Sequence, residues 1–361
     1  MPMNQTKFLR LLQRTKIKTF QAVNFGCRVN AAETNQLSQI LVDNNFRPSK
    51  QSPQIILINT CTITKKGQDE SIRKVKSLHR QFPHSTILVT GCAQFDKIKK
   101  LDKVHIFNNH TKQKILQNQN SYTPQIGDKF SQSQRFILKI QSGCNHFCTY
   151  CIVPFRRPTL WSITIPQAIK TINSAYRHSY REVILTGINL NLYTPDLSNL
   201  LQEILQQTQI PLISFGSIPL NCIDSKFIRL YKQPAYSSRL SHFLHIPIQS
   251  GSNKILKSMN RLYTRQDVFK IIKKIKSKIK NLSLGTDIVV GFPGESQKDF
   301  TQTQTLCQKV GFNKIHVFRY SPRPGTLAKK LFDQLPKIKN SEKIRRSHLI
   351  CQTTLPSDQK P

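Results

Sequence analysis

Residues 135–151 read RFILKIQSGCNHFCTYC. The run RFILKI predicts a short β-strand, and three cysteines follow it closely, at Cys144, Cys148 and Cys151. This C-x3-C-x2-C spacing lets three thiolates bind one inorganic cluster. Iron–sulfur clusters usually take four thiolates, so a site with three leaves one iron open for a substrate or cofactor. A zinc ion is the alternative, and its fourth ligand would have to be His146, the only local candidate.

Downstream of these cysteines, apolar segments alternate with helical patterns. Candidate helices include residues 166–178 and 265–280. The candidate strands after the first are 182–187, 211–217, 242–248, 282–291 and 314–320. Six alternating β/α steps predict a parallel barrel, complete or partial, over residues 135–335. Its functional site is expected at the C-terminal ends of the strands.

A different unit precedes the barrel, over residues 18–118. It contains three similar phrases, TFQAVNFGC, IILINTC and TILVTGC, which end at Cys27, Cys61 and Cys92. Each phrase predicts a strand that ends at a cysteine, and the phrases lie about one βαβ step apart. Since right-handed crossovers make such strands parallel, their carboxyl ends share one edge of the sheet. We therefore expect these cysteines to meet in space, with three buried structural cysteines as the alternative.

The remaining stretches are polar or basic. Residues 119–134 are rich in Asn, Gln and Ser, which predicts a linker, and residues 336–361 form a basic and then polar tail. The chain has 55 Lys and Arg against 18 Asp and Glu, a formal charge of +37. This charge favours an anionic partner, usually nucleic acid, with basic faces at 273–280 and 337–346 as candidate contacts. A generally Lys-rich composition with solvated faces is the alternative.

The cysteine count and the hydropathy pattern exclude several classes of protein. Nine cysteines are an odd number, and the long chain has no recognisable secretion signal. A disulfide framework is therefore not expected, whereas metal or redox chemistry in a reducing cytoplasm is. No run of about 18 apolar residues occurs, so we expect no membrane-spanning helix and no membrane partner.

The three-cysteine motif after the first barrel strand resembles the radical S-adenosylmethionine (SAM) superfamily. Read together, the two units resemble the methylthiotransferase family within it, over roughly residues 18–350. The motifs that carry this resemblance are GCRVNAAE (26–33), NTCTIT (59–64), VTGCAQ (89–94), KIQSGCNHFCTYCIVPFRR (139–157), EVILTGINL (182–190), HIPIQSGSNKILKSMNR (245–261), GTDIVVGFPGE (285–295) and HVFRYSPRPGT (316–326).

The resemblance implies an α/β fold, in which an N-terminal open parallel α/β sheet domain is followed by a partial (β/α)6 radical SAM barrel. It also implies SAM and two [4Fe-4S] clusters as cofactors. The cluster that binds SAM and yields a 5′-deoxyadenosyl radical would be held by Cys144, Cys148 and Cys151. An auxiliary cluster, which carries the sulfur or methylthio group, would be held by Cys27, Cys61 and Cys92. Further contacts to SAM would come from Tyr150, Gly187, Gln249 and Ser250.

The phrases GCRVNAAE and VTGCAQ are most similar to the branch that acts on N6-threonylcarbamoyladenosine in tRNA. The expected enzyme is a cytoplasmic transferase that adds a methylthio group to C2 of this nucleoside at tRNA position 37, next to the anticodon. Besides tRNA, its expected partners are a sulfur source and an electron donor such as flavodoxin or ferredoxin. The alternatives are the branches for isopentenyladenosine tRNA or ribosomal-protein aspartate, and a truncated, non-catalytic iron–sulfur protein that binds RNA.

The chain also departs from the family pattern. Family members usually end with a small RNA-binding β-barrel, called TRAM, and we expect that domain to be absent from the tail at 336–361. GCAQ lacks one residue of the usual GCYAQ, and the stretches RRPTLWSIT (156–164) and ISFGSIPL (213–220) differ from the usual ones. Both cysteine triads are nevertheless complete, which favours a working enzyme.

Overall fold

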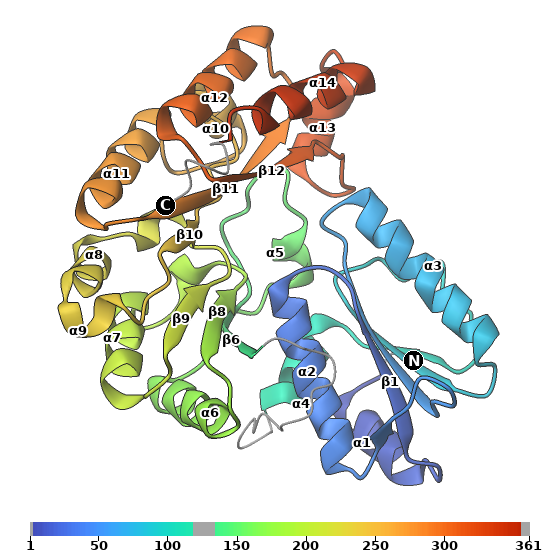
Figure 1. Ribbon diagram of the computed structural model, residues 1–361. Helices are drawn as coiled ribbons and strands as arrows, with labels where there is room; N and C mark the ends of the chain where they lie inside the picture. Colours follow the sequence, from blue (N-terminus) through green and yellow to red (C-terminus); the bar gives the residue numbers. More distant parts are fainter. Residues whose placement is uncertain (1–2, 118–133, 355–361) are drawn as a thin grey trace.

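The computed structural model describes residues 3–117 and 134–354, which form an N-terminal unit and a larger C-terminal unit side by side (Figure 1). The predicted linker at 119–134, apart from Gln134, lies outside the described residues, and so do residues 355–361 of the predicted tail. Within the described ranges, no helix is long and apolar enough to span a membrane.

The N-terminal unit is built on a five-stranded parallel sheet with the order β2-β1-β3-β4-β5. Its central strand, β3 (Ile55–Thr60), is buried at every residue, as expected of the continuous apolar run IILINT between two helical layers. Alternate strand residues such as Leu57 and Ile58 belong to separate cores on the two faces. The other elements are α1 (Gln5–Arg14), β1 (Thr19–Asn24), α2 (Arg28–Asp43), β2 (Arg47–Pro48), α3 (Lys65–Gln81), β4 (Thr86–Gly91), β5 (Val104–Ile106) and α4 (Asn109–Gln117).

The C-terminal unit contains six parallel strands that lie in chain order. Four strands form one sheet, β7-β6-β8-β9, and three form another, β10-β11-β12, with a parallel bridge from Ile213 to Leu240 at the junction. The strands are β6 (Arg135–Ser142), the antiparallel β7 (Trp161–Ser162), β8 (Glu182–Gly187), β9 (Leu212–Phe215), β10 (Phe243–His245), β11 (Ser283–Val290) and β12 (Lys314–Arg319). Figure 1 shows these strands as an open, curved sheet with its open side toward the N-terminal unit. The predicted partial barrel is thereby confirmed.

Helices cover the outer side of this curved sheet (Figure 1). The main ones are α6 (Ile165–Arg177), α7 (Leu197–Gln207), α8 (Ser225–Lys232), α11 (Arg265–Lys278) and α12 (Gln297–Val310). Polar residues begin several of them: Thr164 and Thr264 each form a capping box with the residue three positions later. The shorter helices are α5 (Val153–Arg156), α9 (Pro234–Ser237), α10 (Asn253–Ser258), α13 (Leu327–Gln334) and α14 (Asn340–Cys351).

Most strand boundaries agree with the sequence pattern, and the differences have local causes. Strand β1 ends at Asn24 rather than at Cys27, because Gly26 adopts a φ of 98° and turns the chain, so that Cys27 becomes the N-cap of α2. Strand β10 is shorter than the predicted 242–248, since Pro247 has no amide to donate to a neighbouring strand. The short strands β2, β5 and β7 and the helix α1 were not predicted.

The two units contact each other through α2, which packs against β6 and β8. Arg28, in the first turn of α2, donates hydrogen bonds to the carbonyl oxygens of Phe215 (3.2 Å) and Gly216 (3.0 Å) at the end of β9. The edge of the N-terminal sheet that follows the strands therefore lies against the open side of the barrel.

Candidate functional site

A cavity of about 770 Å³ lies between the open side of the barrel and the first turn of α2. It is lined by strand-end residues of the barrel and by the turn that contains Cys27. Of the six cysteines that the sequence singles out, four line this cavity: Cys27, Cys144, Cys148 and Cys151. The barrel triad and Cys27 of the N-terminal triad therefore line one cavity.

The barrel triad lies on the loop after β6. Gly143 begins this loop with a φ of 83°, and a Cβ there would lie 2.2 Å from the carbonyl oxygen of Thr159, so only glycine fits. Two side chains donate to the sulfurs: Asn189 Nδ2 to Cys144 Sγ (3.7 Å) and Arg261 Nη1 to Cys148 Sγ (3.5 Å). These donors suit thiolates, which are the metal-binding form of cysteine.

Three of the four predicted SAM contacts line the cavity. They are Tyr150, Gly187 and Gln249. A Cβ at Gly187 would lie 2.7 Å from Leu190 and 2.9 Å from Gln141, so glycine allows both buried side chains to pack against this strand end. Ser250, the fourth, is fully buried, and its hydroxyl hydrogen-bonds Thr303 (3.2 Å). The structure therefore places Ser250 behind the cavity wall and not on its surface.

The spacing of the cysteines distinguishes a single zinc ion from a larger cluster. A zinc ion bound at about 2.3 Å by each sulfur would bring the sulfurs within about 4 Å of one another. In the described residues, only one group of three or more His, Cys, Asp or Glu side chains has all its ligand atoms within 4.8 Å, and neither triad belongs to it. In neither triad, therefore, do the three sulfurs lie as close together as a single zinc ion requires.

The N-terminal triad meets at the end of the sheet, as the topology predicts. Cys61 and Cys92 directly follow β3 and β4 and are buried, while Cys27 caps α2. Gly26 brings the first turn against the second cysteine, because a Cβ at Gly26 would lie 2.8 Å from Cys61 Sγ. Burial raises the pKa of the Cys27 and Cys61 thiols, and the neighbouring thiols of the triad raise it further, as expected of side chains gathered in one place.

A buried group of charges lies directly beside this triad. Glu33 of α2 forms ion pairs with Lys112 (2.6 Å), Lys139 (3.1 Å) and Arg157 (2.7 Å), and no side chain of the four is more than 2% exposed. Arg157 also donates through Nε to Cys92 Sγ (3.4 Å), and Asn109 Nδ2 donates to the same sulfur (3.6 Å). Lys139 and Arg157 come from the barrel, so this charge group joins the two units.

The charges of this group do not balance. Burial alone would raise the pKa of Glu33, but Arg157, Lys112 and Lys139 hold it well below its ordinary value, so the carboxylate is ionised. Burial lowers the pKa of Lys112 to about 8, which still leaves it mostly protonated at neutral pH. Three cations then face one carboxylate, and an excess of positive charge in a buried place is costly unless an anion lies next to it. The three thiolates of the N-terminal triad, bound to a cluster, would supply that anion.

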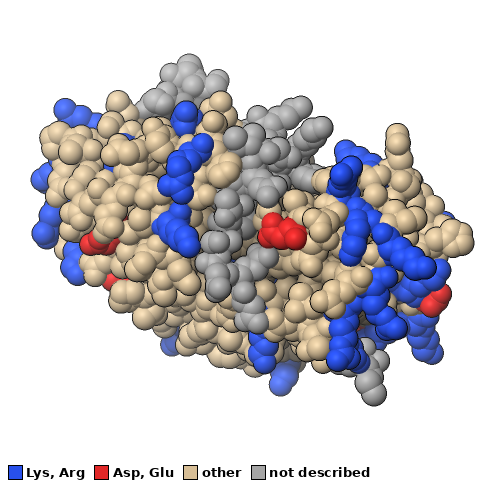
Figure 2. Space-filling view, turned by 90° about the horizontal axis from the view of Figure 1, so that it is seen from below, with Lys and Arg blue, Asp and Glu red and all other residues tan. Residues whose placement is uncertain are grey.

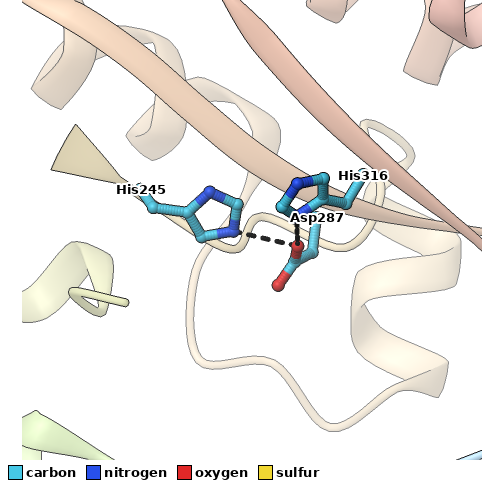
Figure 3. A group of neighbouring side chains, drawn as sticks. All are labelled: His245, Asp287 and His316. Atoms are coloured by element: carbon cyan, nitrogen blue, oxygen red, sulfur yellow. Dashed lines mark hydrogen bonds and ion pairs between the residues drawn. The ribbon is translucent and has the colours of Figure 1, made fainter. Parts of the chain in front are cut away.

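A third group of side chains lies on the barrel wall of the cavity. His245, Asp287 and His316 come from the neighbouring strands β10, β11 and β12 and point toward one another (Figure 3). The Asp287 carboxylate lies 2.9 Å from His245 Nε2 and 3.4 Å from His316 Nδ1. Neither these three residues nor the charges around Glu33 were predicted from the sequence. In both cases the partners are far apart in the chain and meet only through the fold.

The basic surface is only partly where the sequence predicted it. In the predicted face at 337–346, Lys343 and Arg346 are buried: the Lys343 ammonium lies over the ring of Tyr320, and Arg346 pairs with Glu295 (2.6 Å). Those two residues are therefore structural, and their assignment to an exposed face was wrong. On α11, by contrast, Lys273, Lys274 and Lys278 are all exposed.

Basic side chains also gather on the N-terminal unit. Figure 2 shows one face of the molecule, on which Lys and Arg outnumber Asp and Glu and are densest at the right, the side of the N-terminal unit in Figure 1. Exposed basic residues of that unit include Arg10, Arg14, Arg73 and Lys76.

Comparisons with known proteins agree with this geometry. Residues 138–307 match the radical SAM superfamily, and residues 19–111 match the uncharacterized protein family UPF0004. The threonylcarbamoyladenosine tRNA methylthiotransferase MtaB of Thermotoga maritima is 30% identical over 353 residues, covering 91% of this chain and 80% of the relative. The Chlamydia pneumoniae protein of that name is 34% identical, covering 88% of this chain and 78% of the relative.

Other matches carry other names. The tRNA-2-methylthio-N(6)-dimethylallyladenosine synthase of Carboxydothermus hydrogenoformans is 32% identical, covering 91% of this chain and 82% of the relative. Among solved structures, the radical SAM methyltransferase TsrM from Kitasatospora setae, with cobalamin and a [4Fe-4S] cluster bound, aligns with a TM-score of 0.62 at 12% identity. This alignment covers 88% of this chain and 78% of TsrM. At that identity the likeness concerns the fold alone.

Proposed function

The chain belongs to the radical SAM methylthiotransferases, whose cofactors are SAM and [4Fe-4S] clusters, and we propose that it modifies N6-threonylcarbamoyladenosine in tRNA. The proposed reaction replaces the hydrogen on C2 of the adenine, at position 37 next to the anticodon, with a methylthio group. The choice of nucleoside rests on the motifs GCRVNAAE and VTGCAQ, because relatives with either nucleoside in their names are about equally similar.

The observation that carries this proposal is the cavity shared by the two triads. A sulfur-bearing group held on one side and a radical formed on the other must both reach the same carbon atom. Cys27 and the barrel triad line one cavity, so a nucleotide inserted there contacts both sides. A protein that kept its clusters only as structure would need no such common space.

In this proposal, the barrel unit at 135–335 binds SAM. Cys144, Cys148 and Cys151 hold the first cluster, which together with SAM supplies the hydrogen-abstracting 5′-deoxyadenosyl radical. Asn189 and Arg261 donate hydrogen bonds to the sulfurs and so stabilise their thiolate form. Around the SAM molecule, Tyr150 and Gln249 offer hydrogen-bonding side chains, and Gly187 offers backbone at a strand end that lines the cavity.

The N-terminal unit at 18–118 holds the auxiliary cluster in this proposal, through Cys27, Cys61 and Cys92. The chain's own contribution is the buried excess of positive charge around Glu33, which offsets the negative charge of a cluster bound to three thiolates. Arg323, from the loop after β12, hydrogen-bonds Gln68 (2.6 Å) and the hydroxyl of Thr62, next to Cys61. The barrel thus closes the auxiliary site from outside.

The reaction needs partners that the chain does not contain. The proposal places the enzyme in the cytoplasm, with tRNA as substrate, a one-electron donor such as flavodoxin or ferredoxin, and a source of sulfur. Phosphates of the tRNA would contact exposed basic side chains such as those of α11.

The test is a nucleoside analysis of tRNA from a strain that lacks this gene, complemented in parallel with the gene. We expect 2-methylthio-N6-threonylcarbamoyladenosine to disappear, its unmethylthiolated precursor to accumulate, and the gene to restore the product. Loss of the isopentenyl-type methylthio nucleoside instead would contradict the choice of branch. An unchanged set of methylthio nucleosides would contradict the activity itself.

A further inference from the structure

The group on the cavity wall, His245, Asp287 and His316, has no role in holding either cluster. Exposure rises across it: the His245 side chain is 8% exposed, that of Asp287 is 20% exposed, and that of His316 is 48% exposed. His245 therefore lies at the back of the group and His316 at the front, where it faces the open cavity. Asp287 accepts a hydrogen bond from His245, and its carboxylate lies 3.4 Å from Nδ1 of His316, so the other ring nitrogen of His316 faces away from Asp287.

Strand β12 adds a cation beside this group. Lys314, His316 and Phe318 alternate along the strand, and all three line the cavity, whereas Ile315 is buried on the other face. Lys314 is exposed, and in the described part of the chain no ion pair or hydrogen bond of its ammonium is found. Residues two apart on a strand lie about 7 Å from each other, so one small group can contact both Lys314 and His316.

The charge balance of the cavity indicates what this position binds. Asp287 is the only acid among the described residues that line the cavity, and its carboxylate already lies against two imidazoles, those of His245 and His316. Arg261 and Arg28 are directed to Cys148 Sγ and to backbone carbonyls, so both already have partners. Lys314 is then the one Lys or Arg among the described lining residues without a partner, it lies beside the ring of His316, and a cation beside a donor ring favours a carboxylate or phosphate.

We propose that Lys314 and His316, backed by Asp287 and His245, bind the carboxylate of the threonyl group on N6 of the substrate adenosine. The inference rests on the proposed function, which supplies a nucleoside with a carboxylate at that position. Phe318, the next cavity residue of β12 and 38% exposed, offers an aromatic face to the attached base. An isopentenyl group at the same place would lie against Lys314 and Asp287 and could form neither a hydrogen bond nor an ion pair with them.

The experiment measures the affinity of the reconstituted protein for three anticodon stem-loop RNAs that differ only at position 37. One carries adenosine, one N6-threonylcarbamoyladenosine and one N6-isopentenyladenosine. We expect the natural chain to prefer the threonylcarbamoyl RNA. Lys314→Gln should weaken binding of that RNA about tenfold, the effect of one lost hydrogen bond to a charged group, and leave the adenosine RNA unchanged. His316→Ala should act in the same direction.

Controls separate this contact from a loss of structure. Lys309→Gln removes an exposed lysine of α12 that does not line the cavity, and it should change none of the three affinities. Iron content and the free energy of unfolding should be unchanged in Lys314→Gln. If His316→Ala does not take up iron, Lys314→Gln alone decides the question.

Several outcomes would overturn the inference. A natural chain that prefers the threonylcarbamoyl RNA, with variants that keep the same preference, would refute the contact and leave the proposed function standing. An equal loss for all three RNAs would show that Lys314 contacts a backbone phosphate. A preference abolished by EDTA and restored by zinc would replace the direct contact by a metal bridge among His245, Asp287 and His316. A natural chain that prefers the isopentenyl RNA, or none, would refute the choice of branch and this inference together.

Discussion

The two cysteine triads differ in what surrounds them. The barrel triad lies on one loop, faces an open cavity and receives its hydrogen bonds from Asn189 and Arg261 of the same unit. The N-terminal triad is assembled from two strand ends and the N-cap of α2, and the charges beside it come from both units. The first arrangement leaves space for a small molecule that must enter and leave. The second favours a cluster that stays in place and depends on the contact between the units.

The largest contrast is expected in catalysis. Cys148→Ala should abolish both cleavage of SAM and formation of the methylthio nucleoside, because the radical originates at the barrel triad. Cys61→Ala should still cleave SAM to 5′-deoxyadenosine under a strong reductant, yet give no methylthio product. Both products can be followed by liquid chromatography and mass spectrometry. Full activity of Cys61→Ala would show that the N-terminal triad is not needed for sulfur insertion.

A large effect on stability is expected at only one triad. Glu33→Ala leaves three buried cations without their carboxylate, which should lower the free energy of unfolding by about 3–5 kcal/mol, as for other broken buried ion pairs. Asp96→Asn, at an exposed pair with Lys99, should leave the stability almost unchanged, because solvent screens that pair. Urea unfolding of the reconstituted variants gives both values, and equal small costs would show that the charge group does not hold the units together.

The loss of stability caused by Glu33→Ala should become smaller in acid. The cations around Glu33 hold its pKa well below the ordinary value, so its stabilising contribution is present above about pH 4.3 and is lost as pH falls through the lower pKa of the folded protein. The gap in stability between the natural chain and Glu33→Ala should therefore shrink as pH falls below about 4.3. A gap that grows below that pH would mean that Glu33 is not ionised in the folded protein.

A smaller, local effect should separate the triads by reduction potential. Arg157 donates to a sulfur of one triad and Arg261 to a sulfur of the other. Reduction adds negative charge to a cluster, so Arg157→Gln should lower the potential of the auxiliary cluster alone, by about 50–100 mV, and Arg261→Gln should lower that of the SAM cluster alone. Redox titration followed by electron paramagnetic resonance tests both, and a shift of both potentials by either variant would contradict separate sites.

The smallest effect concerns tRNA at the molecular surface. The Lys273→Gln, Lys274→Gln and Lys278→Gln triple variant should make the salt dependence of tRNA binding shallower, by about 0.7–0.9 log units per lost phosphate contact. Lys343→Gln removes a buried lysine and should leave that slope unchanged while lowering stability. The opposite pattern would reassign the RNA surface to the C-terminal helix.

The sequence was sufficient for what local patterns determine. EVILTG forms β8 over the predicted residues, and the strand-end positions of Cys61 and Cys92 follow from two continuous apolar runs in a parallel sheet. The sequence was insufficient to predict the burial of charged side chains that point inward. Lys343 and Arg346 belong to a basic run, but α14 turns them toward Tyr320 and Glu295, so composition alone suggested an exposed face.

One missed feature left a detectable signal. Glu33 lies four residues after Val29 and four before Leu37, all on the buried face of α2, which marks an inward-pointing charge. Its partners Lys139 and Arg157 are more than a hundred residues away in the chain, so no local pattern identifies them. The group on β10, β11 and β12 was missed for the same reason, since it forms only when three strands come into register.

The most direct test of two separate cluster sites is an iron count on three chains after anaerobic reconstitution. The natural chain should bind about eight irons, from two clusters of four. One variant replaces Cys144, Cys148 and Cys151 with Ala, and the other replaces Cys27, Cys61 and Cys92 with Ala. We expect about four irons in each variant, with the Mössbauer parameters of a [4Fe-4S] cluster in both. A triple variant that keeps all eight irons, or that binds none while remaining folded, would contradict the account.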